Sequence, residues 1–231
     1  MPSHSRTRIK VCGITREQDI DTAIALGVDA IGLVFYPHSP RYLSLERANQ
    51  LVRSLPPFVT TVGLFVNATP AQLASTVAQV PLTSLQFHGD ETPEECLVAQ
   101  QKYRLPILRA ARIRPELDLR AFAANFIERG GCRGILLDAW VDSYGGAGQA
   151  FDWTLVPPSW RDGSGPLCTL SGGLNAQNVA QAMALLNPYA VDVSSGVETS
   201  PGIKNAARMQ EFVAAVRDAD LAALSTRTHL R

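Results

Sequence analysis

The sequence predicts a single-domain (βα)8 barrel, the TIM-barrel fold in which eight parallel strands close on themselves. Short runs rich in β-branched residues alternate with amphipathic helical patterns along the chain, an order that is typical of parallel strands joined by helices. The predicted strands number eight, which is the number that closes such a barrel. A doubly wound open sheet is the alternative, but the Gly-x-Gly-x-x-Gly fingerprint expected after its first strand is absent from the sequence.

Each predicted strand is a short apolar run that ends in a glycine or polar turn. The runs are residues 9–12, 30–35, 60–66, 84–87, 107–111, 134–138, 167–170 and 190–194. Between them apolar residues recur at helical spacing. Several helices begin with a capping signal, such as Ser44, Asn175, or Thr69 and Thr92 before prolines. The helical patterns cover residues 16–26, 44–54, 70–79, 92–101, 116–127, 176–186 and 205–215.

Two segments depart from this alternation. Residues 141–153 contain a Gly-Gly-Ala-Gly run and are predicted to form a mobile loop. Residues 157–166 are rich in Pro, Gly and Ser, and only two predicted strands follow them, too few for a second domain. We expect them to be a surface connection in place of a full sixth helix. One domain therefore covers residues 1–231, with the barrel at about 8–217 and frayed tails at 1–7 and 220–231.

The composition is that of an ordinary globular protein. Hydrophobic residues make up 46% of the 231 residues and charged residues 18%, and the formal net charge of zero disfavours a nucleic-acid or membrane partner. No apolar run approaches the roughly 20 residues of a membrane span, and the N-terminal residues lack the apolar segment of a signal peptide. The four cysteines are far apart, which argues against a disulfide framework or a zinc site. We expect a cytoplasmic protein.

In a parallel barrel the carboxyl ends of all strands open on one face, so polar residues at those ends converge. Cys12 ends the first predicted strand, and it is either a catalytic thiol or a small buried hydrophobe, as free cysteines often are. Asp138 directly follows three apolar residues, where an unpaired carboxylate would cost several kcal/mol. We expect Asp138 to be functional, the alternative being a helix-cap or loop hydrogen bond.

The loops after the seventh and eighth predicted strands are expected to bind phosphate. Residues 171–175 and 194–198 each place small residues before a predicted helix start, where backbone N–H groups and the helix dipole favour an anion. This is also the usual phosphate position in the fold. A tight turn is the alternative explanation for either loop alone. The candidate residues are Gly172, Gly173, Ser194, Ser195 and Gly196.

Two further residues near strand ends are candidates for substrate binding. Arg41 could bind a carboxylate in bidentate fashion, or it could be a solvated surface arginine. His88 could be a base or a hydrogen-bond donor to substrate, or it could bond to local backbone. The other histidines, His4, His38 and His229, do not cluster with it in sequence, so we expect no metal site.

Segments at every predicted strand end match one enzyme family in order. They are Lys10-Val11-Cys12-Gly13-Ile14-Thr15, Gly32-Leu33-Val34-Phe35-Tyr36, Ser39-Pro40-Arg41-Tyr42, Val62-Gly63-Leu64-Phe65-Val66-Asn67, Gln86-Phe87-His88-Gly89-Asp90-Glu91, Leu137-Asp138, Leu170-Ser171-Gly172-Gly173-Leu174 and Val191-Asp192-Val193-Ser194-Ser195-Gly196-Val197-Glu198. Together they resemble the N-(5′-phosphoribosyl)anthranilate isomerase family of tryptophan biosynthesis. One departure is Ala147, which stands where the family has threonine in a Gly-Gly-Thr-Gly loop.

The resemblance implies an Amadori rearrangement of a phosphorylated aminosugar, an internal redox reaction that needs no cofactor. It assigns Asp138 as the general acid that opens the furanose ring and Cys12 as the general base that removes the C2′ proton. It also assigns Arg41 to the anthranilate carboxylate and the two glycine- and serine-rich loops to the phosphate. His88 and Asp192 are further candidates for substrate binding. The resemblance leaves monomer and homodimer open.

A buried thiol needs help to ionise, because an unperturbed cysteine with a pKa of ~8.5 is only a few per cent thiolate at pH 7. Lys10 shares the face of Cys12 by strand alternation, and its ammonium could lower the thiol pKa. Asp192 on the neighbouring eighth strand could hold that lysine in place.

Other activities would need other residues. The imidazole-pathway aminoaldose isomerase has aspartate where Cys12 stands, and ribulose-phosphate epimerase needs a multi-histidine metal cluster. A catalytically inactive barrel that binds a phosphorylated ligand would be marked by loss of Cys12 or Asp138, and the sequence has both.

Overall fold

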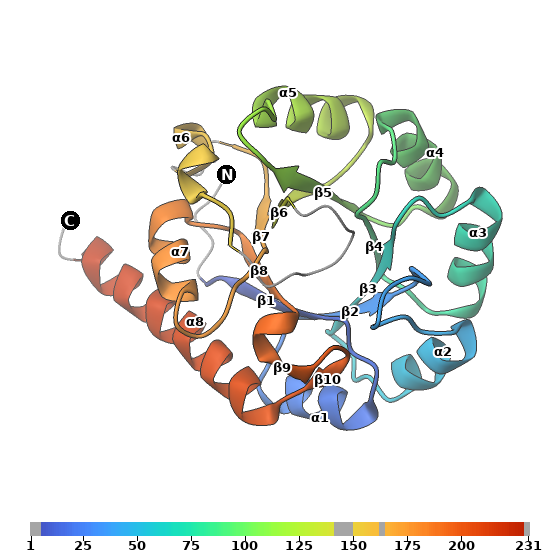
Figure 1. Ribbon diagram of the computed structural model, residues 1–231, viewed down its shortest axis with the longest axis horizontal. Helices are drawn as coiled ribbons and strands as arrows, with labels where there is room; N and C mark the ends of the chain where they lie inside the picture. The colour runs from blue at the N-terminus through green and yellow to red at the C-terminus, as the bar shows by residue number, and fades with distance from the viewer. Residues whose placement is uncertain (1–5, 141–149, 162–164, 229–231) are drawn as a thin grey trace.

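The computed structural model describes residues 6–140, 150–161 and 165–228, with the side chains described as far as residue 225. Eight parallel strands form a closed barrel in chain order, and the first strand pairs with the eighth. Figure 1 looks down this barrel, with the helices arranged around it. The strands are β1 (Arg8–Cys12), β2 (Ala30–Val34), β3 (Thr60–Phe65), β4 (Ser84–Phe87), β5 (Ile107–Ile113), β6 (Gly134–Ala139), β7 (Cys168–Leu170) and β8 (Ala190–Val193). The predicted TIM barrel is confirmed.

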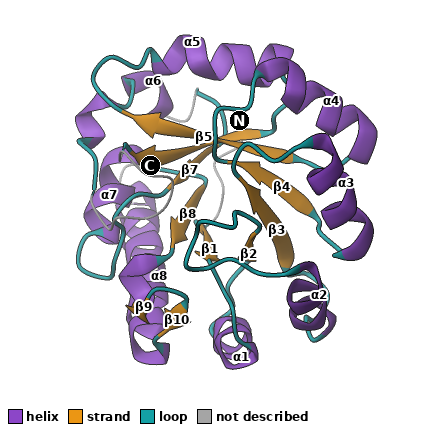
Figure 2. Ribbon diagram, turned by 45° about the vertical axis from the view of Figure 1, so that its right-hand side comes forward, coloured by secondary structure: helices purple, strands orange, loops and turns teal. Residues whose placement is uncertain are grey.

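The helices follow the strands in the predicted order. Their bounds are α1 (Glu17–Ala25), α2 (Leu45–Arg53), α3 (Pro70–Gln79), α4 (Pro93–Tyr103), α5 (Leu119–Ala124), α6 (Pro158–Arg161), α7 (Val179–Leu186) and α8 (Ala206–Thr228), with a π-helical turn η1 (Asn125–Arg129) continuing α5. A 3₁₀ turn, η2 (Trp153–Leu155), precedes α6. Figure 2 shows the strands enclosed by these helices. In the part of the chain that the structure describes, no helix has the length and apolar character needed to cross a membrane.

Helix starts follow the capping signals in the sequence where the cap is a hydroxyl residue. Thr69 and Thr92 each form a full capping box, with Gln72 and Glu95 respectively, and Ser44 accepts a hydrogen bond from the third residue of α2. Asn175 is different. Its side chain accepts hydrogen bonds from the backbone of Gln177 and Asn178, and α7 begins only at Val179. The prediction that this helix starts at residue 176 is therefore wrong by one turn.

The prediction that the chain frays from residue 220 is also wrong, because α8 continues to Thr228. Both carboxylate oxygens of Asp220 accept the backbone N–H of Thr7, at 3.1 and 2.9 Å, and one also accepts its hydroxyl at 2.7 Å. These bonds join the C-terminal half of the last helix to the residue before β1. Residues 1–5 and 229–231 of the predicted tails lie outside the described residues.

The connection between β6 and β7 has no long helix in its described part, as predicted. It contains the single turn α6, whose Trp160 is buried with 6% exposure, so this connection packs against the core as well as covering the surface. The predicted mobile loop lies largely at 141–149, outside the described residues.

The segment after β8 differs most from the prediction. A 3₁₀ turn, η3 (Ser195–Val197), leads into an antiparallel hairpin of β9 (Glu198–Ser200) and β10 (Ile203–Lys204), and only then does α8 begin. In Figure 1 this hairpin lies beside β1 and α1. It therefore brings residues of the eighth loop to the end of the first strand.

Candidate active site

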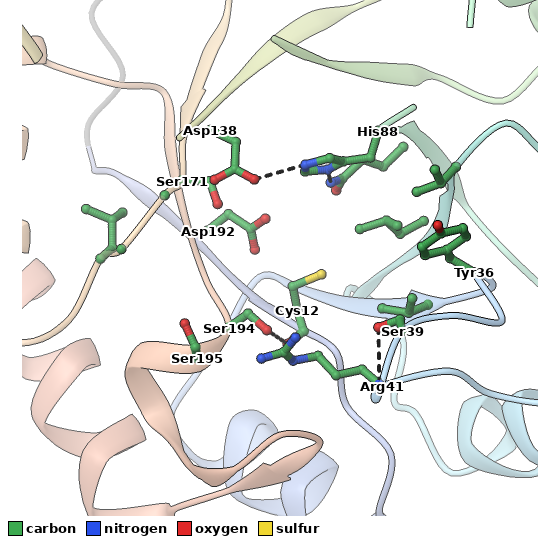
Figure 3. Close-up of a pocket in the computed structure, with 17 residues that line it drawn as sticks. Cys12, Tyr36, Ser39, Arg41, His88, Asp138, Ser171, Asp192, Ser194 and Ser195 are labelled. Carbon is green, nitrogen blue, oxygen red and sulfur yellow. Dashed lines mark hydrogen bonds and ion pairs between the residues drawn. The ribbon is translucent and has the colours of Figure 1, made fainter. Parts of the chain in front are cut away.

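A pocket opens at the carboxyl ends of the barrel strands, and most of the predicted site residues line it. Figure 3 shows their side chains converging on it from different strands. The predicted residues in the lining are Cys12, Arg41, His88, Asp138, Gly172, Gly173, Asp192, Ser194 and Ser195. Gly196, also predicted, is not part of the lining. The convergence expected of barrel strand ends is thus observed.

Cys12 ends β1 and is buried, with 5% of its surface exposed. Its thiol lies over Gly32 of the neighbouring strand, and a Cβ at Gly32 would be 2.6 Å from Sγ and 3.1 Å from Lys10 Nζ. The first distance is too short for a real Cβ, and the second is tighter than most Cβ contacts. Glycine at position 32 therefore leaves the space in which the thiol and the ammonium group of Lys10 lie together.

Lys10 and Asp192 form a buried ion pair beneath the thiol, as hypothesised from the sequence. Lys10 Nζ donates to Asp192 Oδ2 at 2.8 Å, and the two residues are register partners on β1 and β8. Burial favours a lower pKa for Lys10, but the charges of Asp192 and Cys12 outweigh it and raise that pKa. The other oxygen of Asp192, Oδ1, is buried and has no hydrogen-bond partner among the described residues.

The thiol itself is harder to ionise than an ordinary cysteine. Burial raises the pKa of Cys12 above its usual value, although Lys10 and Lys204 act to lower it. Lys10 therefore acts in the hypothesised direction and lowers the pKa of the thiol, but the opposing effect of burial is larger.

Asp138 is held from two sides. Its Oδ1 accepts the backbone N–H of Ala139 at 2.9 Å, and its Oδ2 lies 2.9 Å from Nε2 of His88. Gln86, two residues before His88 and on the same face of β4, places its amide nitrogen 2.9 Å from His88 Nδ1. With the amide nitrogen assigned as the donor, Nδ1 accepts and Nε2 carries the imidazole proton that faces Asp138. His88 therefore bonds to the candidate acid and not to local backbone.

The two predicted phosphate loops pack against each other through backbone. A Cβ at Gly196 would be 2.0 Å from the carbonyl oxygen of Leu174, so only glycine allows this contact. Gly172 has a positive φ of 78°, and a Cβ there would be 2.7 Å from the backbone nitrogen of Ala139. The loops thus lie close to Asp138 as well as to each other. Ser194 Oγ donates to the carbonyl oxygen of Cys12 at 3.0 Å.

Arg41 is 7% exposed, so the alternative of a solvated surface arginine is wrong. Its Nε and Nη2 donate to the two carboxylate oxygens of Glu198, at 2.9 and 2.7 Å. The hydrogen bonds to Glu198 raise the pKa of the guanidinium further. Lys204 Nζ donates to the same carboxylate at 2.8 Å. Glu198 and Lys204 belong to the hairpin that the sequence did not predict.

Sequence reasoning missed three buried polar residues of the site, for different reasons. Gln86 could have been found, because strand alternation places it on the face of His88. Glu198 lay within a quoted motif but had no visible partner, since Arg41 is 157 residues away in sequence. Lys204 carried no signal without the hairpin.

Nothing in the described residues groups three His, Cys, Asp or Glu side chains as metal ligands. All four cysteines are free and buried.

Comparisons with known proteins agree over nearly the whole chain. A family model described as N-(5'phosphoribosyl)anthranilate (PRA) isomerase matches residues 9–215. A curated N-(5'-phosphoribosyl)anthranilate isomerase from Ralstonia nicotianae is 56% identical over 227 residues, which cover 96% of this chain and 97% of that protein.

Solved structures of similar proteins share the fold. The phosphoribosyl anthranilate isomerase of Thermotoga maritima is 40% identical with a TM-score of 0.82, covering 92% of this chain and 99% of its own. A second, 38% identical with a TM-score of 0.79 and the same coverage, is in complex with reduced 1-(o-carboxyphenylamino)-1-deoxyribulose 5-phosphate. A third, 37% identical with a TM-score of 0.79 and again the same coverage, is a monomer generated from the dimeric Thermotoga maritima enzyme.

Proposed function

Because this chain belongs to the N-(5′-phosphoribosyl)anthranilate isomerase family, we propose that Asp138 and Cys12 are the acid and the base of its reaction. The chain is an isomerase of tryptophan biosynthesis. The reaction converts N-(5-phosphoribosyl)anthranilate to 1-(2-carboxyphenylamino)-1-deoxyribulose 5-phosphate. The observation that carries the proposal is that the carboxylate and the thiol line one pocket from two different strands (Figure 3).

In the first step Asp138 donates its proton to the furanose ring oxygen. The bond between that oxygen and C1′ breaks, and the nitrogen lone pair forms a C1′=N double bond, which gives a protonated Schiff base. Asp138 must be presented at the pocket wall for this transfer, and the hydrogen bonds from Ala139 and His88 fix its carboxyl group there.

In the second step Cys12 removes the proton from C2′. The electrons of that C–H bond form a C1′=C2′ double bond, and those of the C1′=N bond return to nitrogen, which gives an enolamine. Loss of the C2′ hydroxyl proton and protonation of C1′ then complete the ketone, and transfer of the proton gained by Cys12 back to Asp138 through solvent restores both groups. Hydrogen moves within one substrate molecule and the electron count is unchanged, so the proposed route uses no external redox cofactor.

The substrate carries anions at both ends, and the pocket offers a partner for each. Arg41 binds the anthranilate carboxylate. The backbone and hydroxyl groups of Gly172, Gly173, Ser194 and Ser195 bind the phosphate, with Gly196 holding the two loops together. Asp192 supports Cys12 through Lys10. The free thiols fit a reducing compartment, and we place the reaction in the cytoplasm.

The acid and base roles are tested by Cys12→Ala and Asp138→Asn. Each should lower kcat by at least ~10²-fold, since a positioned proton-transfer group contributes that much. Turnover is measured from the anthranilate-type fluorescence of the substrate. Binding of the reduced product analogue should persist, because neither change removes an anion contact. A variant that turns over at nearly the wild-type rate would show that its residue is not the acid or the base.

A further inference from the structure

The hairpin after β8 places a buried carboxylate and a buried ammonium group against Arg41. Glu198 on β9 and Lys204 on β10 are register partners, and their side chains are 4% and 0% exposed. Glu198 Oε1 accepts from Arg41 Nε at 2.9 Å and from Lys204 Nζ at 2.8 Å, while Oε2 accepts from Arg41 Nη2 at 2.7 Å. One carboxylate therefore joins two cations.

Glycines at two turns make this arrangement possible. Gly13 has a φ of 76°, and a Cβ there would be 2.3 Å from Arg41 Cδ, so the arginine crosses directly over the turn that follows Cys12. Gly202 has a φ of 82° at the tip of the hairpin, and its N–H donates to Glu198 Oε1 at 3.2 Å. The backbone thus fixes both ends of the Arg41–Glu198 contact.

Lys204 connects the hairpin to two further parts of the pocket. Its Nζ donates to the carbonyl oxygen of Cys12 and lies 3.2 Å from the carbonyl oxygen of Ser194. The same short hairpin therefore touches the strand that carries the proposed base, the loop that carries Arg41 and a loop of the proposed phosphate site.

We propose that Glu198 and Lys204 are positioning residues that determine how Arg41 meets the carboxylate of the substrate, an inference that rests on the proposed role of Arg41. The Nε–Nη2 edge is one at which a guanidinium makes a two-bond fork with a carboxylate. In this pocket Glu198 occupies that edge. Nη1 makes no hydrogen bond to any residue that the structure describes, so the substrate carboxylate meets the Nη1 end of the group.

The cluster keeps one positive charge for this carboxylate. Arg41 and Lys204 contribute two positive charges and Glu198 removes one. Burial alone would raise the pKa of Glu198, but Arg41 and Lys204 hold that pKa below its usual value, so the carboxylate stays charged. Glu198 thus orients Arg41 and at the same time reduces the attraction for an anion. These two effects have opposite consequences when Glu198 is neutralised.

Two ligands measure the carboxylate contact. One is the reduced product analogue, 1-(o-carboxyphenylamino)-1-deoxyribulose 5-phosphate in reduced form, and the other is the same molecule without the ring carboxylate. The ratio of their dissociation constants isolates the contact with Arg41. In Glu198→Gln we expect the carboxylated analogue to bind at least about tenfold more weakly and the other to change less than about threefold, with KM raised and kcat nearly kept. Unchanged or tighter binding of the carboxylated analogue would overturn the proposal, since charge alone would then explain the cluster.

Three variants complete the test. Lys204→Met should also weaken the carboxylated analogue selectively, because the cluster then has no net charge; an unchanged ratio would overturn the role of Lys204. Arg41→Ala separates the proposed role of Arg41 from the proposed roles of Glu198 and Lys204. If Arg41→Ala leaves the ratio of the two dissociation constants unchanged, Arg41 does not bind the substrate carboxylate. If Arg41→Ala abolishes the preference for the carboxylated analogue and Glu198→Gln does not, Arg41 binds the carboxylate but Glu198 does not position it. Glu17→Gln breaks an exposed ion pair with Arg47 and is the matched control, with no change expected.

Folding is checked by binding of the analogue without the carboxylate. Should Glu198→Gln fail this check, Glu198→Asp keeps the charge and withdraws the carboxylate by one methylene, and we expect the same loss of preference. A folded Glu198→Asp protein with the full preference would equally overturn the proposal.

Discussion

Cys12 combines two requirements that oppose each other, a dry pocket and an ionisable thiol. Burial excludes water but raises the pKa of the thiol, and Lys10 and Lys204 oppose that effect. Asp192 acts in the same direction as burial and raises the pKa of the thiol. Arg41 is the other charged group that interacts electrostatically with Cys12. The proposed base is the thiolate form of Cys12, so we expect the rate to rise as pH rises through the pKa of Cys12.

Lys10→Met tests this electrostatic balance. The change removes a positive charge that lowers the pKa of Cys12, so that pKa moves further above its usual value. We expect the rising limb of kcat/KM against pH to move to higher pH, with less activity at neutral pH. Lys102→Met makes the same substitution on the exposed face of α4 and should leave the profile in place. A profile that does not move in Lys10→Met would contradict the role given to this lysine.

Two ion pairs of the pocket differ in whether the sequence could predict them. Lys10 and Asp192 could be paired in advance because they lie at the same level of adjacent strands. The partner of Arg41 could not be predicted, because Glu198 reaches it through the short β9–β10 hairpin, which is distant in sequence and was not predicted. A long side chain can bond to any group within its reach, and the sequence records no such distances.

At the level of elements, the strands and most helix starts were predictable because local physics determines them. Buried strands need apolar runs, and hydroxyl caps satisfy the free N–H groups at a helix start. The β9–β10 hairpin is too short for a hydrophobic pattern to be visible. Its one signal is Pro201-Gly202, a dipeptide typical of tight turns. Polar contacts of Glu198 and Lys204 join this element to Arg41 and to the carbonyl oxygens of Cys12 and Ser194.

The seventh and eighth loops act as one element, since the backbone of Gly196 lies against Leu174. Gly196→Ala should push them apart and raise KM at least about tenfold, because a Cβ 2.0 Å from a carbonyl oxygen forces the backbone to move. Inhibition by inorganic phosphate should weaken in parallel. Gly27→Ala is the control. Gly27 has a φ of 69° but nothing within 4 Å of a Cβ, so this change costs about 1 kcal/mol of stability and leaves KM alone. If KM is equally unaffected in Gly196→Ala, the loops do not bind phosphate together.

For the whole molecule, the barrel explains why residues far apart in sequence meet. Closure of β8 onto β1 brings Asp192 to Lys10, and the common direction of the strands puts Cys12 and Asp138 at one mouth. The fold was predictable because alternation and strand number leave few alternatives. The helical structure of the C-terminal residues was not predictable. Leu221 is 63% exposed, so no apolar face there indicates a helix, and the stabilising contact is the pairing of Asp220 with Thr7.

In the proposed mechanism Asp138 opens the ring before Cys12 removes the C2′ proton. Single-turnover rates with substrate carrying hydrogen or deuterium at C2′ test it most directly in Cys12→Ala and Asp138→Asn. In Cys12→Ala proton removal should be the slow step, so deuterium should slow the reaction well beyond experimental error. In Asp138→Asn ring opening should limit the rate, and the isotope effect should fall close to unity. The reverse pattern, with the large isotope effect in Asp138→Asn and none in Cys12→Ala, would contradict the assignment of the two roles.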